Sequence, residues 1–238
     1  MTISTSNIVS APIFESSRAR AQRAAKFIDE LREELRKYTE RETLMASVTF
    51  TETCEPQITL SWPGIGFHAS AILGDCIHNM RTALDLMASE LARLNQRSDR
   101  DVYFPFAASV VDFPDAVKAK HFDKCGQDAV DLIKTFSPYK GGNEQLRAIH
   151  DLDIQDKHRS LILTMATQDF CLQGDVTCLP VATFQVPVTT KGHQFIFPSG
   201  PLESLPVIET LEELVKLING IIEAFASMVE SRGYHVKS

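Results

Sequence analysis

Residues 69–96 constrain the fold of this chain most. Their apolar residues recur with the period of one long helix, and the opposite face of that helix has an unusual composition. One face of this helix is apolar and contains Leu73, Ile77, Met80, Leu84, Met87 and Leu91. The opposite face is polar and contains Asp75, His78, Asn79, Thr82, Asp85 and Ser89. A solvent face normally consists of long charged side chains, which stay hydrated. Short polar groups instead predict a cleft or a buried polar seam.

The remaining patterns predict an α+β fold. Helices are expected over residues 16–41, 113–122, 126–136 and 143–157, and a last one is expected to start at a capping box at Thr210 and stop at Gly233. A period of two predicts a β-hairpin at 46–62 and strands within 160–198, including 176–179. We expect long N-terminal, central and C-terminal helices packed together, with an antiparallel β-sheet on one side. The chain of 238 residues is expected to form a single domain, residues 1–238, with residues 1–14 as a loose arm.

Composition narrows the function classes. The net charge of −7 provides no basic field, so non-specific nucleic-acid binding is not expected. The five cysteines are scattered without a C-x-x-C pair, which favours reduced, mostly buried thiols. The N-terminus has no basic segment followed by an apolar run, and no run of eighteen apolar residues occurs. No membrane span is therefore expected. Together these features predict a cytoplasmic location.

Two polar concentrations, on the helix at 69–96 and at 150–159, are the candidate site. As catalytic residues we consider His78, Arg81, Asp85, Asp156, His158 and Arg159, and as ligand-binding residues Asp75, Asn79 and Thr82. In a catalytic interpretation, His78 or His158 acts as general base, held by Asp85 or Asp156. Arg81 or Arg159 would then stabilise negative charge developing on a phosphoryl or acyl oxygen.

Two alternatives use the same residues. Asp75 and His78, three positions apart, could bind a metal together with acids or histidines from 150–158, although no dedicated metal motif is present and no metal is assigned. In a structural interpretation, Arg81 or Asp85 forms buried ion pairs with Asp156 or Arg159 that lock two elements together. The apolar stripe of the last helix is either core or the seam of a homodimer.

Several motifs resemble those of a widespread bacterial and phage-associated family for which no activity is established. The similarity rests on Gly74-Asp75, His78-Asn79, Arg81, Ala83-Leu84-Asp85, Phe104-Pro105, Pro138-Tyr139 and Asp156-Lys157-His158-Arg159. The chain departs from that pattern at Leu86, where a histidine is expected. A more distant resemblance to HEPN-type ribonucleases is confined to the fold, because their motif has an arginine and a histidine separated by four to six residues and no such pair occurs here.

We therefore expect a protein whose polar seam, between the central helix and residues 150–159, is structural or forms a small-ligand pocket. A hydrolase acting on a phosphoester or similar bond, with or without a metal, is the alternative. The sequence assigns no cofactor, and its partner hypotheses are a small-molecule ligand and a homodimer through a long helix.

Overall fold

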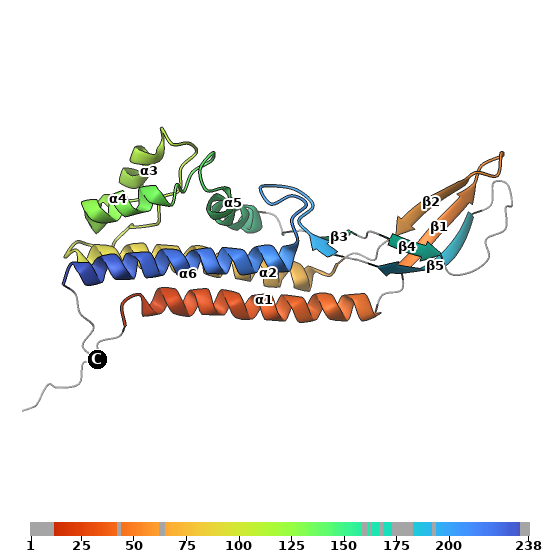
Figure 1. Ribbon diagram of the computed structural model, residues 1–238, viewed down its shortest axis with the longest axis horizontal. Helices are drawn as coiled ribbons and strands as arrows, with labels where there is room; N and C mark the ends of the chain where they lie inside the picture. The colour runs from red at the N-terminus through yellow and green to blue at the C-terminus, as the bar shows by residue number, and fades with distance from the viewer. Residues whose placement is uncertain are drawn as a thin grey trace, which may run out of the picture.

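The computed structural model describes residues 12–41, 44–61, 65–158, 161, 163–166, 169–172, 183–191 and 194–233. Its main elements are three long helices, α1 (Glu15–Arg41), α2 (Phe67–Leu94) and α6 (Val207–Ser231). Figure 1 shows them side by side, and α1 contacts both α2 and α6 along their length. The predicted α+β class, with N-terminal, central and C-terminal helices packed together, is confirmed.

The apolar stripes of the long helices form the core. All six stripe residues of α2 are fully buried, and so are Leu214, Ile218, Ile221, Ile222 and Phe225 of α6. The α6 stripe packs against α1 and α2 of its own chain. It is therefore core, and the homodimer stays a prediction that needs another surface. Phe14, in the segment expected to be loose, is also fully buried, and its backbone N–H donates to Glu90.

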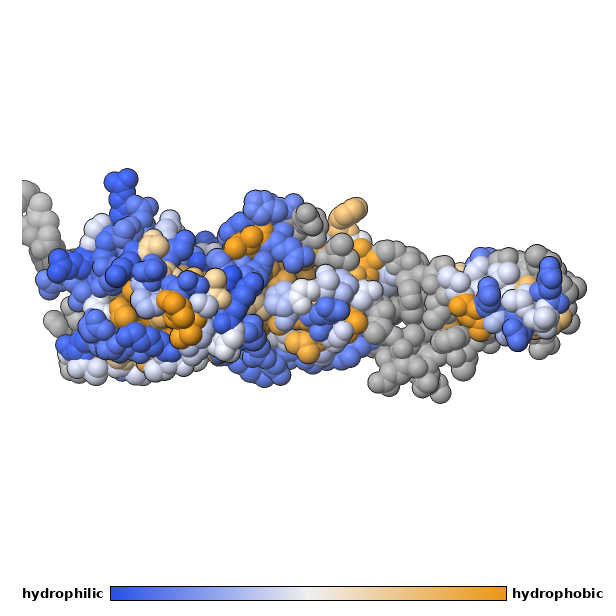
Figure 2. Space-filling view, turned by 90° about the horizontal axis from the view of Figure 1, so that it is seen from above, coloured by the Kyte–Doolittle hydropathy of each residue, from blue (hydrophilic) through white to orange (hydrophobic). Residues whose placement is uncertain are grey.

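A layer of short helices covers the other side of α2 and α6 (Figure 1). It contains α3 (Phe113–Ala119), the 3₁₀ turn η1 (Phe122–Cys125), α4 (Gln127–Thr135) and α5 (Glu144–His158). The apolar segment at 102–106 is extended and buried beside α2, apart from the half-exposed Tyr103. Seen from this side, the helical part of the surface is mostly hydrophilic, with separate hydrophobic patches (Figure 2).

The main β-sheet lies beyond one end of the long helices (Figure 1). Four antiparallel strands, ordered β2-β1-β5-β4, form the main sheet: β1 (Leu44–Phe50), β2 (Pro56–Ser61), β4 (Asp169–Leu172) and β5 (Thr183–Lys191). A second pair joins β3 (Thr164–Ala166) to β6 (Gln194–Ile196). The predicted hairpin and the later β-rich stretch therefore share one sheet, which extends the helical layers at their end. The strand expected at 176–179 falls outside the described residues.

The start of α6 differs from the expectation. Thr210 is inside the helix rather than its N-cap, because the helix begins at Val207 directly after Pro206. The Thr210 N–H already donates to the Pro206 carbonyl, and the side chain is buried. Burial of Val207 and Leu211 favours the earlier start over the capping pattern. Gly233 ends the helix as predicted, at a φ of 85° that favours glycine.

The cysteines differ in part from the expectation. Cys76 and Cys125 are free and buried, and burial raises the pKa of the Cys125 thiol to about 12. Cys54 is disulfide-bonded, so the prediction of reduced thiols is wrong for this residue. No helix in the described part of the chain is both long and apolar enough to cross a bilayer. The cytoplasmic location remains a prediction, and it loses the support of a fully reduced set of cysteines.

Candidate functional site

Helix α5 contacts α2 at Gly74, where the Asp156 side chain lies against the α2 backbone. A Cβ atom at this position would lie only 2.6 Å from the carboxyl carbon of Asp156. Only glycine therefore leaves room for the Asp156 carboxylate on the α2 backbone. Burial raises the pKa of Asp156, and the nearby Asp153 and Asp75 raise it further. This contact brings the two polar concentrations of the sequence together.

Gly74→Ala tests whether this contact sets the position of α5. Helix propensity alone would stabilise the variant by about 1 kcal/mol. We expect net destabilisation by about 1 kcal/mol instead, because the Cβ displaces the Asp156 side chain or α5 itself. Urea unfolding measures the effect.

A double-mutant cycle with Asp156→Ala provides the control. All three atoms nearest to the added Cβ belong to the Asp156 carboxyl group, which this substitution deletes. In that background Gly74→Ala should become stabilising. The same cost in both backgrounds would show that the carboxylate does not define the approach.

His78 of α2 is bound to Asp153 of α5. The His78 Nδ1 atom lies 2.9 Å from Asp153 Oδ1, and the Asp153 side chain is only 5% exposed whereas that of His78 is 54% exposed. The second oxygen of Asp153 accepts a hydrogen bond of 2.6 Å from Lys157 Nζ. Burial opposes ionisation of Asp153, but the hydrogen bonds from Lys157 and His78 outweigh it and lower its pKa. A buried carboxylate thus holds an exposed imidazole in a fixed orientation.

Thr82 lies one helical turn after His78, on the other side of the imidazole ring. Its Oγ1 atom is 3.4 Å from His78 Nε2. In the tautomer that donates the Nδ1 proton to Asp153, Nε2 is an acceptor for the Thr82 hydroxyl. Hydroxyl, imidazole and carboxylate therefore form a continuous chain from the surface to a buried anion.

Arg81 and Asp85 form a buried pair that faces the 102–107 segment. Arg81 donates to Asp85 at 2.7 Å and to the Phe104 carbonyl at 3.4 Å, and its guanidinium lies 4.7 Å from the centre of the Phe106 ring. Asp85 in turn accepts the Phe104 N–H at 2.9 Å. Burial raises the pKa of Asp85, and Arg81 opposes that rise. This pair clamps a connecting segment against α2 and leaves little of either side chain for a substrate.

His150 of α5 packs against Phe106, the ring that the Arg81 guanidinium also contacts. Its ring stacks on Phe106 with the ring centres 4.9 Å apart, and its buried Nδ1 has no hydrogen-bond partner among the described residues. Burial, together with the charges of Arg81 and Arg147, lowers the pKa of His150 to about 4. The ring is therefore neutral at physiological pH.

The lowered pKa predicts a loss of stability in mild acid. Below its ordinary pKa of about 6.5, His150 takes up a proton in the unfolded chain but not in the folded one, until the pH approaches 4. The free energy of unfolding should therefore fall between pH 6.5 and pH 4, by about 1–2 kcal/mol after allowance for partial solvent screening. His150→Phe keeps the stacking and removes the titration, so this loss should be smaller in the variant. Equal losses in both proteins would contradict the assignment.

The other residues predicted for the site do not lie together in the structure. Asn79 is buried and faces α1: its Nδ2 donates to the Asp75 carbonyl and its Oδ1 accepts from Arg20 at 3.3 Å. Asp75 itself is exposed. His158 is exposed at the end of α5, and Arg159 falls outside the described residues. The predicted ligand-binding set of Asp75, Asn79 and Thr82 is thus divided between two sides of α2.

The orienting acid is not the one expected from the sequence. His78 is held by Asp153 rather than by Asp85 or Asp156, and Arg81 pairs with Asp85 of its own helix rather than with α5. The signal for Asp153 was its spacing from Lys157, since an acid followed by a lysine four positions later pairs on one helix face. Within the described ranges, no group of three or more His, Cys, Asp or Glu side chains could hold a metal ion.

Comparison of the chain with protein-family models, with curated proteins and with solved structures finds no match. The functional conclusions below therefore rest on the geometry of the site.

Proposed function

We propose that the protein is a hydrolase in which Asp153, His78 and Thr82 act as orienting acid, general base and nucleophile. The observation that carries this proposal is the hydrogen-bonded chain in which buried Asp153 lies 2.9 Å from His78 Nδ1 while His78 Nε2 lies 3.4 Å from Thr82 Oγ1. A base within reach of a hydroxyl and oriented by a third group is the arrangement that activates a weak nucleophile. Such contacts are often somewhat long without substrate.

The chemistry follows from the three atoms in sequence. Thr82 Oγ1 attacks the electrophilic carbon of an ester, and its proton passes to His78 Nε2. Asp153 stabilises the resulting imidazolium through the Nδ1 proton without taking that proton itself. The imidazolium then protonates the leaving alkoxide. A water molecule, deprotonated by the same nitrogen, attacks the acyl carbon, and Thr82 Oγ1 leaves as it takes the proton back from His78.

The charge around Asp153 and His78 favours an uncharged substrate. Asp153, Asp156 and Asp75 lie close enough to affect one another electrostatically, and Lys157 offsets only part of their charge. A dianionic phosphate monoester would be repelled by this surface. We therefore propose a neutral ester of a small molecule, which enters from the solvent-exposed side of His78.

Hydrolysis of p-nitrophenyl acetate, with p-nitrophenyl phosphate as the anionic comparison, tests the proposal. Thr82→Val keeps the side-chain shape, and His78→Ala removes the base; each should lower kcat/KM for the acetate by about 10²-fold or more. The matched controls are Thr135→Val, whose hydroxyl donates to the Leu132 carbonyl, and His158→Ala, an exposed histidine on α5. Both should retain the parental rate.

The controls also distinguish the proposal from the reactivity of any surface imidazole. If His158→Ala lowers the rate as much as His78→Ala, the hydrolysis is non-specific and the proposal fails. If Thr82→Val retains full activity while His78→Ala does not, Thr82 is not the nucleophile. A parental protein without activity above free imidazole would favour the structural interpretation of the seam.

A further inference from the structure

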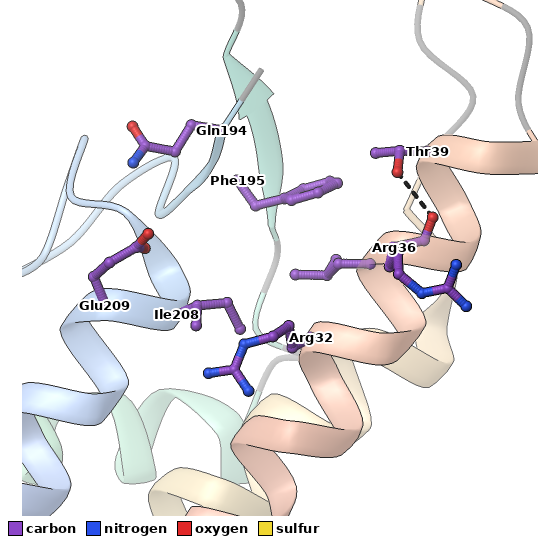
Figure 3. A pocket seen from close by; sticks show the side chains of 8 residues that line it. Arg32, Arg36, Thr39, Gln194, Phe195, Ile208 and Glu209 are labelled. Carbon is purple, nitrogen blue, oxygen red and sulfur yellow. Dashed lines mark hydrogen bonds between the residues drawn. The ribbon is translucent and has the colours of Figure 1, made fainter. Parts of the chain in front are cut away.

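A second concave surface lies away from the α2–α5 seam, where α1, β6 and the start of α6 meet (Figure 3). We call it the α1–β6–α6 hollow. Its volume is about 360 Å³, which falls within the range of roughly 300–1,000 Å³ typical of small-molecule sites. None of its lining residues belongs to the seam, so it is independent of the proposed hydrolase.

The interior of this hollow is apolar. Phe195 of β6 faces it together with Ile208 of α6, and Leu35 of α1 also lines it (Figure 3). Leu35 is 3% exposed and packs into the main core, while Phe195 and Ile208 are only partly covered. Phe195 also contacts Tyr38 of α1, whose ring meets it edge-on at 6.1 Å between centroids. A fixed aromatic face opposite a methyl-rich wall suits a flat apolar group.

Both arginines at the mouth are already neutralised by carboxylates of the chain. Arg32 donates to Asp29 at 2.7 Å and to Glu212 at 2.6 Å. Arg36 donates to Glu33 at 2.8 Å and also to Glu40, and Figure 3 shows its guanidinium turned away from Phe195. An anionic ligand would have to displace these acids. The arginines therefore shape the rim and do not create an anion site.

The remaining charge at the rim is negative. Glu209 lines the hollow from the first turn of α6, and its carboxylate makes no hydrogen bond or ion pair with any described residue. It lies on the same side of the hollow as the Gln194 amide (Figure 3). Of the three charged side chains that line the hollow, Arg32 and Arg36 are paired with carboxylates, whereas Glu209 is not paired with any described residue.

We propose that the α1–β6–α6 hollow binds small amphipathic cations, in which a flat apolar group packs on Phe195 and an ammonium group pairs with Glu209. Both the apolar group and the ammonium group of such a ligand have a contact residue in the hollow. The apolar half covers Phe195 and Ile208, and the ammonium pairs with Glu209, whose carboxylate has no partner among the described residues.

Three probes that share a phenyl ring and differ in charge test this proposal: 2-phenylethylammonium, 3-phenylpropanoate and 2-phenylethanol. Titrations followed through the Ile208 methyl resonance give an affinity for each. The ammonium should bind about 2- to 5-fold more tightly than the alcohol, because one partly exposed ion pair contributes that much, and the carboxylate should bind most weakly. Phe195→Ala should weaken binding of all three.

Glu209→Gln isolates the charge contribution. This variant should bring the affinities of the ammonium and the alcohol together, while Glu230→Gln, the same change at the far end of α6, should leave their ratio unchanged. Unaltered melting temperatures would confirm that both variants fold. Equal or tighter binding of the carboxylate by the parent, an Ile208 resonance that does not move, or an unchanged ratio in Glu209→Gln would each overturn the proposal.

Discussion

Replacing Arg81 by methionine is expected to lower the melting temperature by roughly 6–20 °C, which corresponds to a loss of about 3–5 kcal/mol at this chain length. Methionine fills a similar volume and keeps helix propensity, so the cost arises from the charge that it leaves behind. Asp85 would remain largely buried, with the Phe104 N–H as its hydrogen-bond partner. The contacts of the guanidinium with Phe104 and Phe106 would be lost as well.

Two comparisons distinguish the buried pair from an ordinary surface pair. Arg93→Met removes a pair with Asp99 in which both side chains are about half exposed, and it should change stability by less than about 1 kcal/mol. In the double variant Arg81→Met with Asp85→Leu, part of the lost stability should return because no uncompensated charge stays buried. A melting temperature for Arg81→Met close to that of the parent would contradict the conclusion that this pair holds the 102–107 segment against α2.

Asp153→Asn is expected to lower the rate of ester hydrolysis by about 10²-fold or more. Lys157 can only donate hydrogen bonds, so it retains the amide oxygen and turns the amide NH₂ towards His78 Nδ1. His78 must then carry its proton on Nε2, where it can no longer accept the proton of Thr82. The substitution thus changes the tautomer of the base while its position is kept.

The tautomer itself can be measured. Imidazole ¹⁵N chemical shifts of His78 should show a protonated Nδ1 in the parent and a protonated Nε2 in Asp153→Asn. Lys157→Gln is the matched control, because it removes the neighbouring cation but leaves the Asp153 carboxylate to orient the ring. It should lower the rate far less than Asp153→Asn. Full activity of Asp153→Asn, with the protein folded, would rule out Asp153 as the orienting acid.

The three long helices and the sheet could be predicted from the sequence because their patterns are long and mutually consistent. Six apolar residues at helical spacing in α2 leave one face to bury, and all six are fully buried. The start of α6 was missed for a local reason. A capping pattern at Thr210 competes with the burial of Val207, and burial is the stronger effect.

The partners within the site could not be read from the sequence, because they depend on how two helices cross. The i,i+4 spacing of Arg81 and Asp85 allows these two residues to pair inside α2, as they do in the structure. It could not show that Asp153, rather than Asp156, faces His78, since both acids lie within one turn of α5. In the structure Asp156 lies against Gly74 and Asp153 reaches His78, an arrangement that depends on the crossing of the two helices.

The most direct test of the proposed hydrolase is labelling with a fluorophosphonate, followed by peptide mass spectrometry. Attack of Thr82 Oγ1 on phosphorus expels fluoride while His78 takes the hydroxyl proton, so the reagent reports the nucleophile without knowledge of the natural substrate. We predict a single adduct on the peptide that carries Thr82, absent from His78→Ala and Thr82→Val and retained in His158→Ala. A folded parent protein with no adduct on Thr82, or with equal labelling in His78→Ala, would contradict the account.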